Sequence, residues 1–196
     1  MHPLAKTDKI VKGSVLNVAI HQARDLADVV AEIDAIIVLD TSLSMNTYDA
    51  PDGKSRFEYA LSVLEQFQNK YEGKIALLCF NDEVVFCPSG FPPYNLGDNS
   101  TDMVKALNEI LIADAVPSIK KILISDGEPN DPGATLEVAR KFKKSKVDTI
   151  YIGSELYDNR GRDFLKKLSD LTGGQFNINA SGKLLDVTIT KYLEVK

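Results

Sequence analysis

The sequence has no long apolar run and no recognisable leader. Its longest wholly apolar stretches, Ala35–Leu39 and Ile75–Phe80, are far shorter than the roughly 20 residues that a helix needs to cross a bilayer. The first residues, MHPLAKTDKIVKG, lack an apolar segment followed by a small-residue cleavage site. We therefore expect a cytoplasmic protein that has no membrane partner.

Cysteine and histidine are scarce. Cys79 and Cys87 are too few for a disulfide framework and lack the CxxC spacing of metal sites, so we expect two buried thiols. His2 and His21 both lie near the N-terminus, which gives a Ser-His-Asp triad little support, and no GxSxG motif occurs. These absences argue against an enzyme.

Basic charge is also in short supply. The chain has 23 Lys and Arg against 28 Asp and Glu, which gives a net charge of −5. Because affinity for phosphates depends mainly on clustered Lys and Arg, this balance disfavours nucleic acid as a direct partner. One basic run, from Arg140 to Lys146, begins on a predicted helix, where we interpret it as a solvated face.

The length of 196 residues suits one α/β domain. From residue 34 onward, short apolar runs alternate with segments of helical periodicity, which is typical of a mostly parallel sheet covered on both faces. The predicted strands are 35–39, 74–80, 84–87, 119–124, 147–152 and 175–178, and the predicted helices are 57–67, 103–111, 135–144, 162–171 and 184–195. Since Asn81-Asp82-Glu83 would close a hairpin, we expect a three-layer α/β/α fold with one antiparallel edge strand.

Residues 1–33 precede this alternating pattern. Apolar side chains there follow one helical stripe, formed by Leu16, Ile20, Ala23, Ala27 and Val30. We interpret residues 1–33 as an N-terminal extension, helical or mixed in structure, that packs on a domain of residues 34–196. Alternatively, the stripe forms the edge of a partner-binding surface.

Oxygen-bearing side chains gather in three segments next to predicted strands and helices. Asp40-Thr-Ser42-Leu-Ser44 follows the first strand, Ser100-Thr101-Asp102 opens a helix, and Asp126-Gly127 follows the strand 119–124. Ligands of parallel α/β sheets bind beyond the carboxyl ends of the strands, so these segments would converge. Two carboxylates and three hydroxyls, with no Lys or Arg among them, would repel one another or stay unsatisfied. A hard cation, Mg²⁺ or else Mn²⁺ or Ca²⁺, would solve that problem.

The same residues carry a resemblance to a known family. Asp40-Thr-Ser-Leu-Ser-Met resembles the DxSxS motif of the von Willebrand factor A (VWA) domain family. Asn99-Ser-Thr-Asp-Met103 and Ile124-Ser-Asp-Gly-Glu-Pro129 resemble the two segments that complete its metal-ion-dependent adhesion site (MIDAS). Leu43 stands where glycine is common, and Asn99-Ser100 where two glycines often occur, but neither departure removes a ligand.

The resemblance implies a Rossmann-like fold over residues 34–196 and five metal ligands, namely Asp40, Ser42, Ser44, Thr101 and Asp126. It also implies one open coordination position on the metal. In the family, a carboxylate from a partner protein typically fills that position. The expected function is therefore that of a metal-dependent protein-binding module whose partner presents an Asp or Glu.

Three other interpretations stay open. Ser and Asp residues at these positions could serve only to cap helices and close turns. The chain could belong to a ribonucleoprotein or another nucleic-acid-associated complex, since some relatives with this fold sit in RNA-binding particles. A metal-dependent hydrolase is the third interpretation, although no motif positions a general base.

Overall fold

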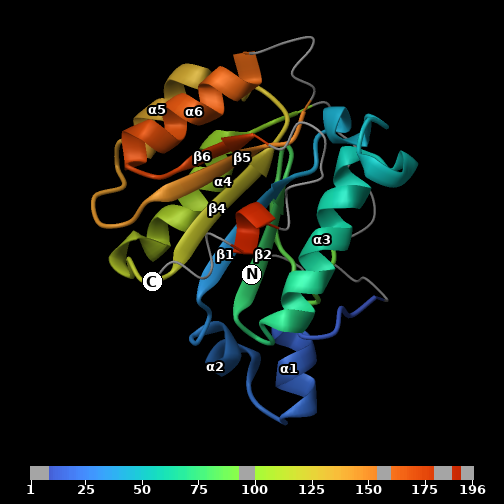
Figure 1. Ribbon diagram of the computed structural model, residues 1–196. Helices are drawn as coiled ribbons and strands as arrows, with labels where there is room; N and C mark the ends of the chain where they lie inside the picture. The colour runs from blue at the N-terminus through green and yellow to red at the C-terminus, as the bar shows by residue number, and fades with distance from the viewer. Residues whose placement is uncertain (1–8, 93–99, 154–159, 179–186, 191–196) are drawn as a thin grey trace.

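One sheet lies at the centre of the computed structural model, which describes residues 9–92, 100–153, 160–178 and 187–190. Its strands within these ranges are β1 Ala35–Asp40, β2 Ile75–Phe80, β3 Val84–Phe86, β4 Lys120–Ser125, β5 Val147–Tyr151 and β6 Phe176–Ile178. Their order is β3-β2-β1-β4-β5-β6, and every neighbouring pair is parallel except β2 and β3 (Figure 1). The predicted α/β class is therefore confirmed, including its antiparallel edge strand.

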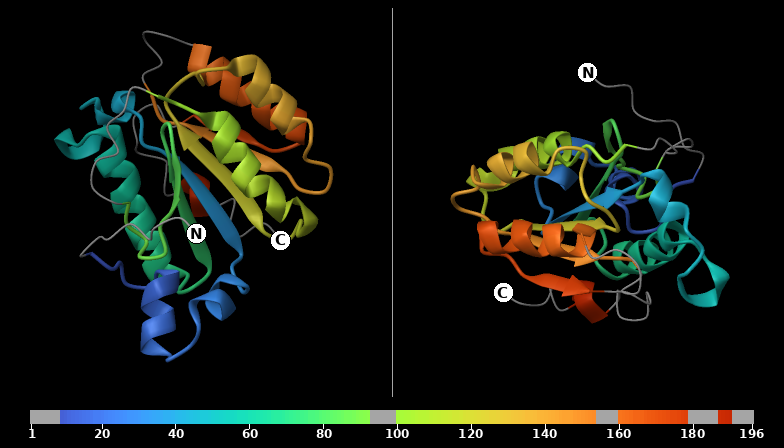
Figure 2. Two further views of the ribbon diagram at one scale, coloured as in Figure 1. Left: turned by 180° about the vertical axis from the view of Figure 1, so that it is seen from behind. Right: turned by 90° about the horizontal axis from the view of Figure 1, so that it is seen from above.

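Helices cover both faces of the sheet (Figure 2). They are α1 Val15–His21, α2 Leu26–Val30, α3 Arg56–Lys70, α4 Met103–Leu111, α5 Pro132–Ala139 and α6 Arg160–Thr172, with short 3-10 turns η1 Leu43–Asn46, η2 Pro51–Gly53 and η3 Ile112–Ala115. Successive side chains of β1 point to opposite faces: Ile37 and Leu39 pack in one cluster with α3, whereas Ile36 and Val38 pack in another with α4, α5 and α6. These two apolar layers hold β1 at the centre of the fold.

The start of α3 is fixed by a capping box. The hydroxyl of Ser55 accepts a hydrogen bond from the backbone N–H of Glu58, and the Glu58 carboxylate accepts one from the backbone N–H of Ser55. The cap places Arg56 in the first turn of α3.

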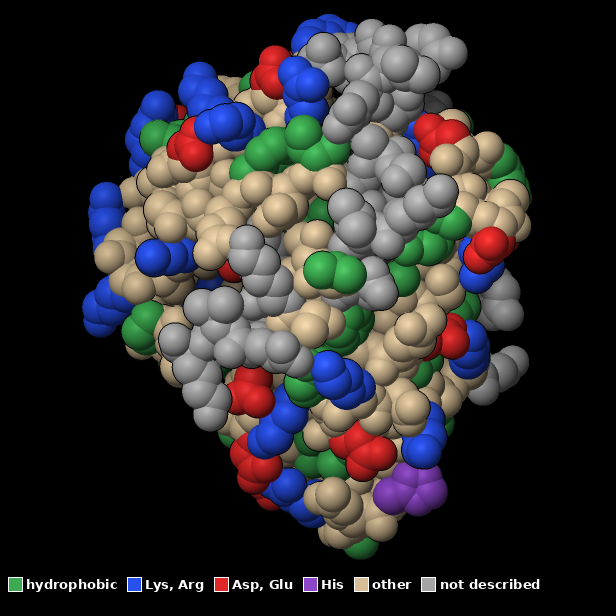
Figure 3. Space-filling model, viewed as in Figure 1, with side chains coloured by type: hydrophobic (Ala, Val, Ile, Leu, Met, Phe, Trp, Pro, Cys, Tyr) green, Lys and Arg blue, Asp and Glu red, His purple; other side chains and the backbone are tan. Residues whose placement is uncertain are grey.

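The predicted helix 135–144 is wrong at its C-terminal end, because α5 ends at Ala139. The Asp114 carboxylate accepts hydrogen bonds from the backbone N–H groups of Lys143, Lys144 and Ser145, at 3.1, 3.1 and 2.8 Å, and so holds that stretch in a turn. The basic run thus follows the helix instead of forming one of its faces. On the face drawn in Figure 3, several Lys and Arg side chains lie over α6, with a few Asp and Glu side chains among them.

Cys79 and Cys87 are free and buried, as predicted. Of the predicted helix 184–195, residues 187–190 are helical, and the remainder lies outside the described residues. Within the described ranges, no helix combines the length and the apolar character that a bilayer crossing requires.

Residues 9–33 form two short helices in place of one continuous helical stripe. The backbone turns at Ala23, whose φ is +50°, and the Asp25 side chain then caps α2. Ile20 consequently leaves the stripe and is 58% exposed, whereas Val15 and Val29 are buried in the core. This segment therefore contributes side chains to the same apolar cluster as α4, α5 and α6.

Backbone hydrogen bonds also tie this segment to distant parts of the chain. The N–H groups of Val11 and Leu16 donate to the carbonyls of Ser89 and Pro88, at 2.8 and 2.9 Å. The N–H of Gly73 donates to the carbonyl of Gly13 at 2.8 Å. Residues 11–16 thus bridge the turn that follows α3 and the loop that follows β3.

Replacing Gly13 with alanine is expected to lower the free energy of unfolding by about 3 kcal/mol or more. Gly13 has a φ of +78°, and a Cβ added there would lie 2.1 Å from the carbonyl oxygen of Gln68, so the backbone of α3 would have to move. Urea unfolding would measure the loss. Gly53→Ala is the matched control, because Gly53 has a φ of +68° with nothing within 4 Å of an added Cβ, and we expect it to cost about 1 kcal/mol. Equal losses in the two variants would contradict a special role for the contact between Gly13 and α3.

Candidate metal centre

The two acidic residues of the predicted site lie at the carboxyl ends of neighbouring strands. Asp40 is the last residue of β1, and Asp126 comes directly after β4. Because β1 and β4 pair in parallel, with Leu39 opposite Ile124, both carboxylates emerge at the same edge of the sheet. Asp40 has no exposed surface, and the side chain of Asp126 has none either.

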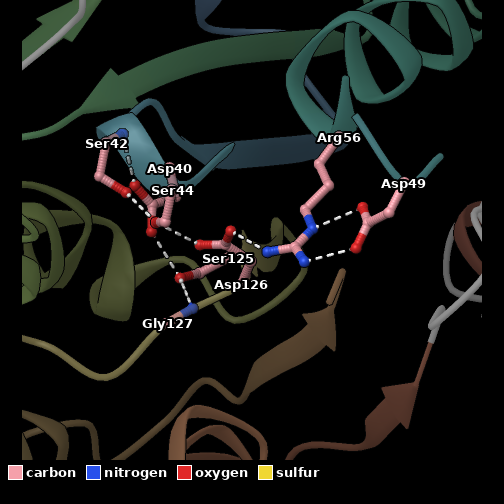
Figure 4. A network of polar contacts seen from close by, with 8 residues as sticks. All are labelled: Asp40, Ser42, Ser44, Asp49, Arg56, Ser125, Asp126 and Gly127. Atoms are coloured by element: carbon pink, nitrogen blue, oxygen red, sulfur yellow. Dashed lines mark hydrogen bonds and ion pairs between the residues drawn. The ribbon is translucent and has the colours of Figure 1, made fainter. Parts of the chain in front are cut away.

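A continuous chain of hydrogen bonds joins four of the five predicted ligands (Figure 4). Asp40 Oδ1 accepts from the backbone N–H of Ser42 at 2.8 Å, which folds the loop back toward the strand end. The hydroxyls of Ser42 and Ser44 lie 3.0 Å apart, and Ser44 Oγ donates to Asp126 Oδ1 at 2.8 Å. The structure therefore brings Asp40, Ser42, Ser44 and Asp126 together from segments more than 80 residues apart.

Thr101, the fifth predicted ligand, lies in the segment that leads into α4. Its backbone N–H donates to the Asn130 side chain at 3.0 Å, and its carbonyl accepts from the Asn130 N–H at 3.1 Å, so it is fastened to the loop that follows Asp126. Among the described residues, the Thr101 hydroxyl makes no hydrogen bond to the other four. Asn99, which belongs to the same motif, lies outside the described residues.

Burial disfavours the negative charge of both carboxylates. It raises the pKa of Asp40 from 3.8 to about 7, and the nearby charge of Asp126 adds to the rise, while hydrogen bonds from Ser125 and Ser42 oppose it. Burial also raises the pKa of Asp126, against the opposing effects of its hydrogen bonds with Arg56 and Ser44. A cation placed between the two carboxylates would offset this cost.

Two residues of the network were absent from the sequence expectation. Ser125 Oγ donates to Asp40 Oδ2 at 2.5 Å and accepts from the backbone N–H of Gly127 at 3.2 Å. Arg56 Nη1 donates to Asp126 Oδ2 at 2.6 Å, so a cation stands beside the carboxylates, although no Lys or Arg occurs in the three motif segments. The sequence offered two signals for these residues. Ser125 immediately precedes Asp126, and Arg56 lies in the first turn of the α-helix that follows the DxSxS motif.

The donor set fits a hard divalent cation. Within the described part of the chain, no group of three or more His, Cys, Asp and Glu is placed to hold a metal, so a site here would have to include hydroxyl oxygens. Two carboxylates with two or three hydroxyls are suitable for Mg²⁺, which readily keeps water as its remaining ligands. The same oxygens are a poor ligand set for Zn²⁺, which favours His and Cys.

Comparisons with known proteins bear on the fold alone. No family model and no curated protein matches the sequence. A mutant of the PilB minor pilin from Streptococcus sanguinis is similar in structure, with a TM-score of 0.63 and 15% identity over 83% of this chain and 61% of that chain. A further structure of this pilin gives 0.61 and 13% over the same shares. Proximal thread matrix protein 1 from the mussel byssus gives 0.53 and 18%, over 91% of this chain and 50% of that chain. The chain thus spans less than two thirds of each of these proteins, and at these identities the similarity shows a shared α/β fold.

Proposed function

We propose that this chain is a divalent-metal-dependent protein-binding module of the VWA type, without catalytic residues, that acts in the cytoplasm. The observation that carries the proposal is the hydrogen-bonded chain from Asp40 through Ser42 and Ser44 to Asp126. Turn chemistry alone does not require two buried carboxylates to share one network, because a helix cap or a turn is satisfied locally. The shared network supports a single site that uses all four residues.

In this proposal Asp40, Ser42 and Ser44 hold Mg²⁺, or Mn²⁺ or Ca²⁺ in its place, together with Thr101 and Asp126. When bound, the cation supplies Lewis acidity to a carboxylate oxygen of the partner. The chain's own residues supply the shape of the site: Ser125 orients Asp40, and the backbone N–H of Ser42 holds the loop in its turn. Two anionic ligands leave a divalent cation able to attract a third.

Exposed apolar side chains in the loop that follows β1 favour a protein as the partner over a small anion. Leu43, between the two serine ligands, is 48% exposed, and Tyr48 is 71% exposed. Large exposed apolar groups around a polar centre are typical of surfaces that bind proteins. We therefore propose a partner that places an Asp or Glu at the metal and an apolar side chain beside it.

Capture of partners from native cell extract, with Mg²⁺ or with EDTA, tests the proposed function. We expect a protein that is retained in Mg²⁺, is released by EDTA, and loses its affinity when its contacting Asp or Glu is changed to Asn or Gln. Salt should have a modest effect, since a metal–carboxylate bond depends less on screening than contacts with phosphates do. Retention that persists in EDTA, or that falls steeply with salt, would contradict the proposal.

Replacing Gly161 with alanine is expected to weaken Mg²⁺ binding about tenfold without touching a ligand. Gly161, in the first turn of α6, lies against the residue after Asp126: a Cβ added there would be 2.8 Å from the carbonyl carbon of Gly127. That backbone would have to shift, and displaced ligands bind less well. Calorimetric titration with Mg²⁺ measures the effect. Gly133→Ala, where the nearest atom to an added Cβ is 3.4 Å away, should bind as the unaltered chain does. Unchanged affinity in Gly161→Ala would show that α6 does not support the site.

A further inference from the structure

Arg56 is placed between two carboxylates that belong to different parts of the fold. Its Nε and Nη2 donate to Asp49 Oδ1 and Oδ2, at 2.8 and 2.6 Å, and its Nη1 donates to Asp126 Oδ2 at 2.6 Å (Figure 4). The Arg56 side chain is 13% exposed, that of Asp126 is fully buried, and that of Asp49 is 34% exposed. This geometry is stronger than that of a surface ion pair, because it is bidentate on one side and buried on the other.

We propose that Arg56 is a built-in competitor of the divalent cation, which neutralises Asp126 when the site is empty and thereby sets its metal affinity. This inference rests on the proposed function of the site. It assigns Arg56 the regulation of metal occupancy, a role outside the five predicted ligands.

The competition follows from the two oxygens of Asp126. Oδ1 accepts from the Ser44 hydroxyl, and Oδ2 accepts from Arg56. A cation that approached Oδ1 would only require the hydroxyl of Ser44 to turn, since a hydroxyl hydrogen rotates freely and leaves a lone pair for the metal. The guanidinium cannot give up its charge, so it would remain as a positive group next to a divalent one.

Arg56 also links metal binding to the partner. With Asp40 ionised, the charges of Asp40, Asp126 and Arg56 sum to −1 before the cation arrives and to +1 after it, while Asp49 lies on the side of Arg56 away from Asp126. An incoming carboxylate returns that sum to zero. The partner's carboxylate should therefore raise the affinity for the metal, and the metal should raise the affinity for the carboxylate by the same factor.

Asp49 has the opposite role in this scheme, because it neutralises Arg56 from the side away from Asp126. Removing the charge of Asp49 would leave the guanidinium with Asp126 as its one anionic partner among the groups described here, and would strengthen its competition with the metal. The two members of one ion pair are therefore expected to affect metal affinity in opposite directions. If the ion pair were purely structural, replacing either member would change the metal affinity in the same direction.

Titration with Mn²⁺, followed by calorimetry and by the loss of the free Mn²⁺ electron paramagnetic resonance signal, tests the inference on the full chain. We expect Arg56→Met to bind Mn²⁺ at least tenfold more tightly than the unaltered chain, Arg56→Lys to lie between them, and Asp49→Asn to bind at least threefold more weakly. Without metal, Arg56→Met should also melt at a lower temperature, since Asp126 loses its cation, and saturating Mn²⁺ should restore much of that loss.

Each outcome distinguishes the inference from the proposed function. Equal or weaker Mn²⁺ binding by Arg56→Met, while the unaltered chain binds, would overturn the competitor role and leave the metal site standing. Binding by neither chain would overturn both. Should Arg56→Met fail to fold, Asp49→Asn decides, because tighter binding by that variant would contradict the inference and weaker binding would support it.

Discussion

The variant Asp40→Asn is expected to lose at least 100-fold in affinity for Mg²⁺ and Mn²⁺, equivalent to about 2.7 kcal/mol, while keeping its fold. Asp40 is one of the two anionic ligands of the proposed site, and asparagine in its place would leave the cation with Asp126 as its one anionic ligand among the five. The amide oxygen of asparagine still accepts the hydrogen bond from the Ser42 N–H, and its amide nitrogen can face Ser125, so the loop keeps its shape. Calorimetric titration checks the affinity, and circular dichroism checks the fold.

Asp131→Asn provides the matched control, since it removes one negative charge from the loop that follows β4. Asp131 caps α5 by accepting from the N–H of Ala134 at 2.8 Å, and asparagine caps equally well. We expect metal affinity to change less than twofold in this variant. A similar loss in both variants would mean that overall charge, and not ligation by Asp40, governs the binding.

The second large effect concerns pH and needs no metal. Burial raises the pKa of Asp40 to about 7 in the folded protein, against 3.8 for the free side chain, so the folded chain holds this proton more tightly than the unfolded chain. The stabilisation from this proton is therefore fully present below pH 3.8 and is lost as the pH rises through 7. At about 1.4 kcal/mol for each of roughly three pH units, the loss reaches up to about 4 kcal/mol.

Urea unfolding of the metal-free chain and of Asp40→Asn between pH 5 and 8 would measure the upper two pH units of this loss, about 3 kcal/mol. As the pH rises, the free energy of unfolding of the unaltered chain should fall relative to that of Asp40→Asn. Saturating Mg²⁺ favours the ionised carboxylate, so it should stabilise the unaltered chain more at pH 8 than at pH 5. A difference that stays constant across this range would show that Asp40 is ionised in the folded protein throughout.

Local patterns predicted the sheet and its connections well. The run 35–39 is wholly apolar and 119–124 ends in three apolar residues; their short length and polar boundaries favoured strands over helices, and the structure pairs them as β1 and β4. Helix ends were less predictable where a distant group decides them. The early end of α5 depends on Asp114, which lies about 30 residues away from the amides that it binds.

The candidate site likewise has residues that could be predicted from the sequence and residues that could not. Asp40, Ser42 and Ser44 lie on one loop, and Asp126 follows a strand whose neighbour could be anticipated, so sequence spacing was enough to bring them together. Arg56 lies 70 residues from Asp126 in the sequence. They become partners because the long Arg56 side chain reaches from the first turn of α3 to the end of β4, which the sequence does not reveal. Thr101 was selected by resemblance, and its position beside Asn130 depends on loop contacts that no periodicity encodes.

The alternating strand and helix pattern of the sequence begins at residue 34, which suggests that position as the start of a truncated recombinant protein. The bonds from Val11 and Leu16 to Ser89 and Pro88, and from Gly73 to Gly13, argue against that choice. A truncated version starting at 34 would expose the apolar side chains that Val15 and Val29 cover, and would be prone to precipitate. A trimmed version intended for crystallisation or screening should therefore keep everything from residue 9 onward.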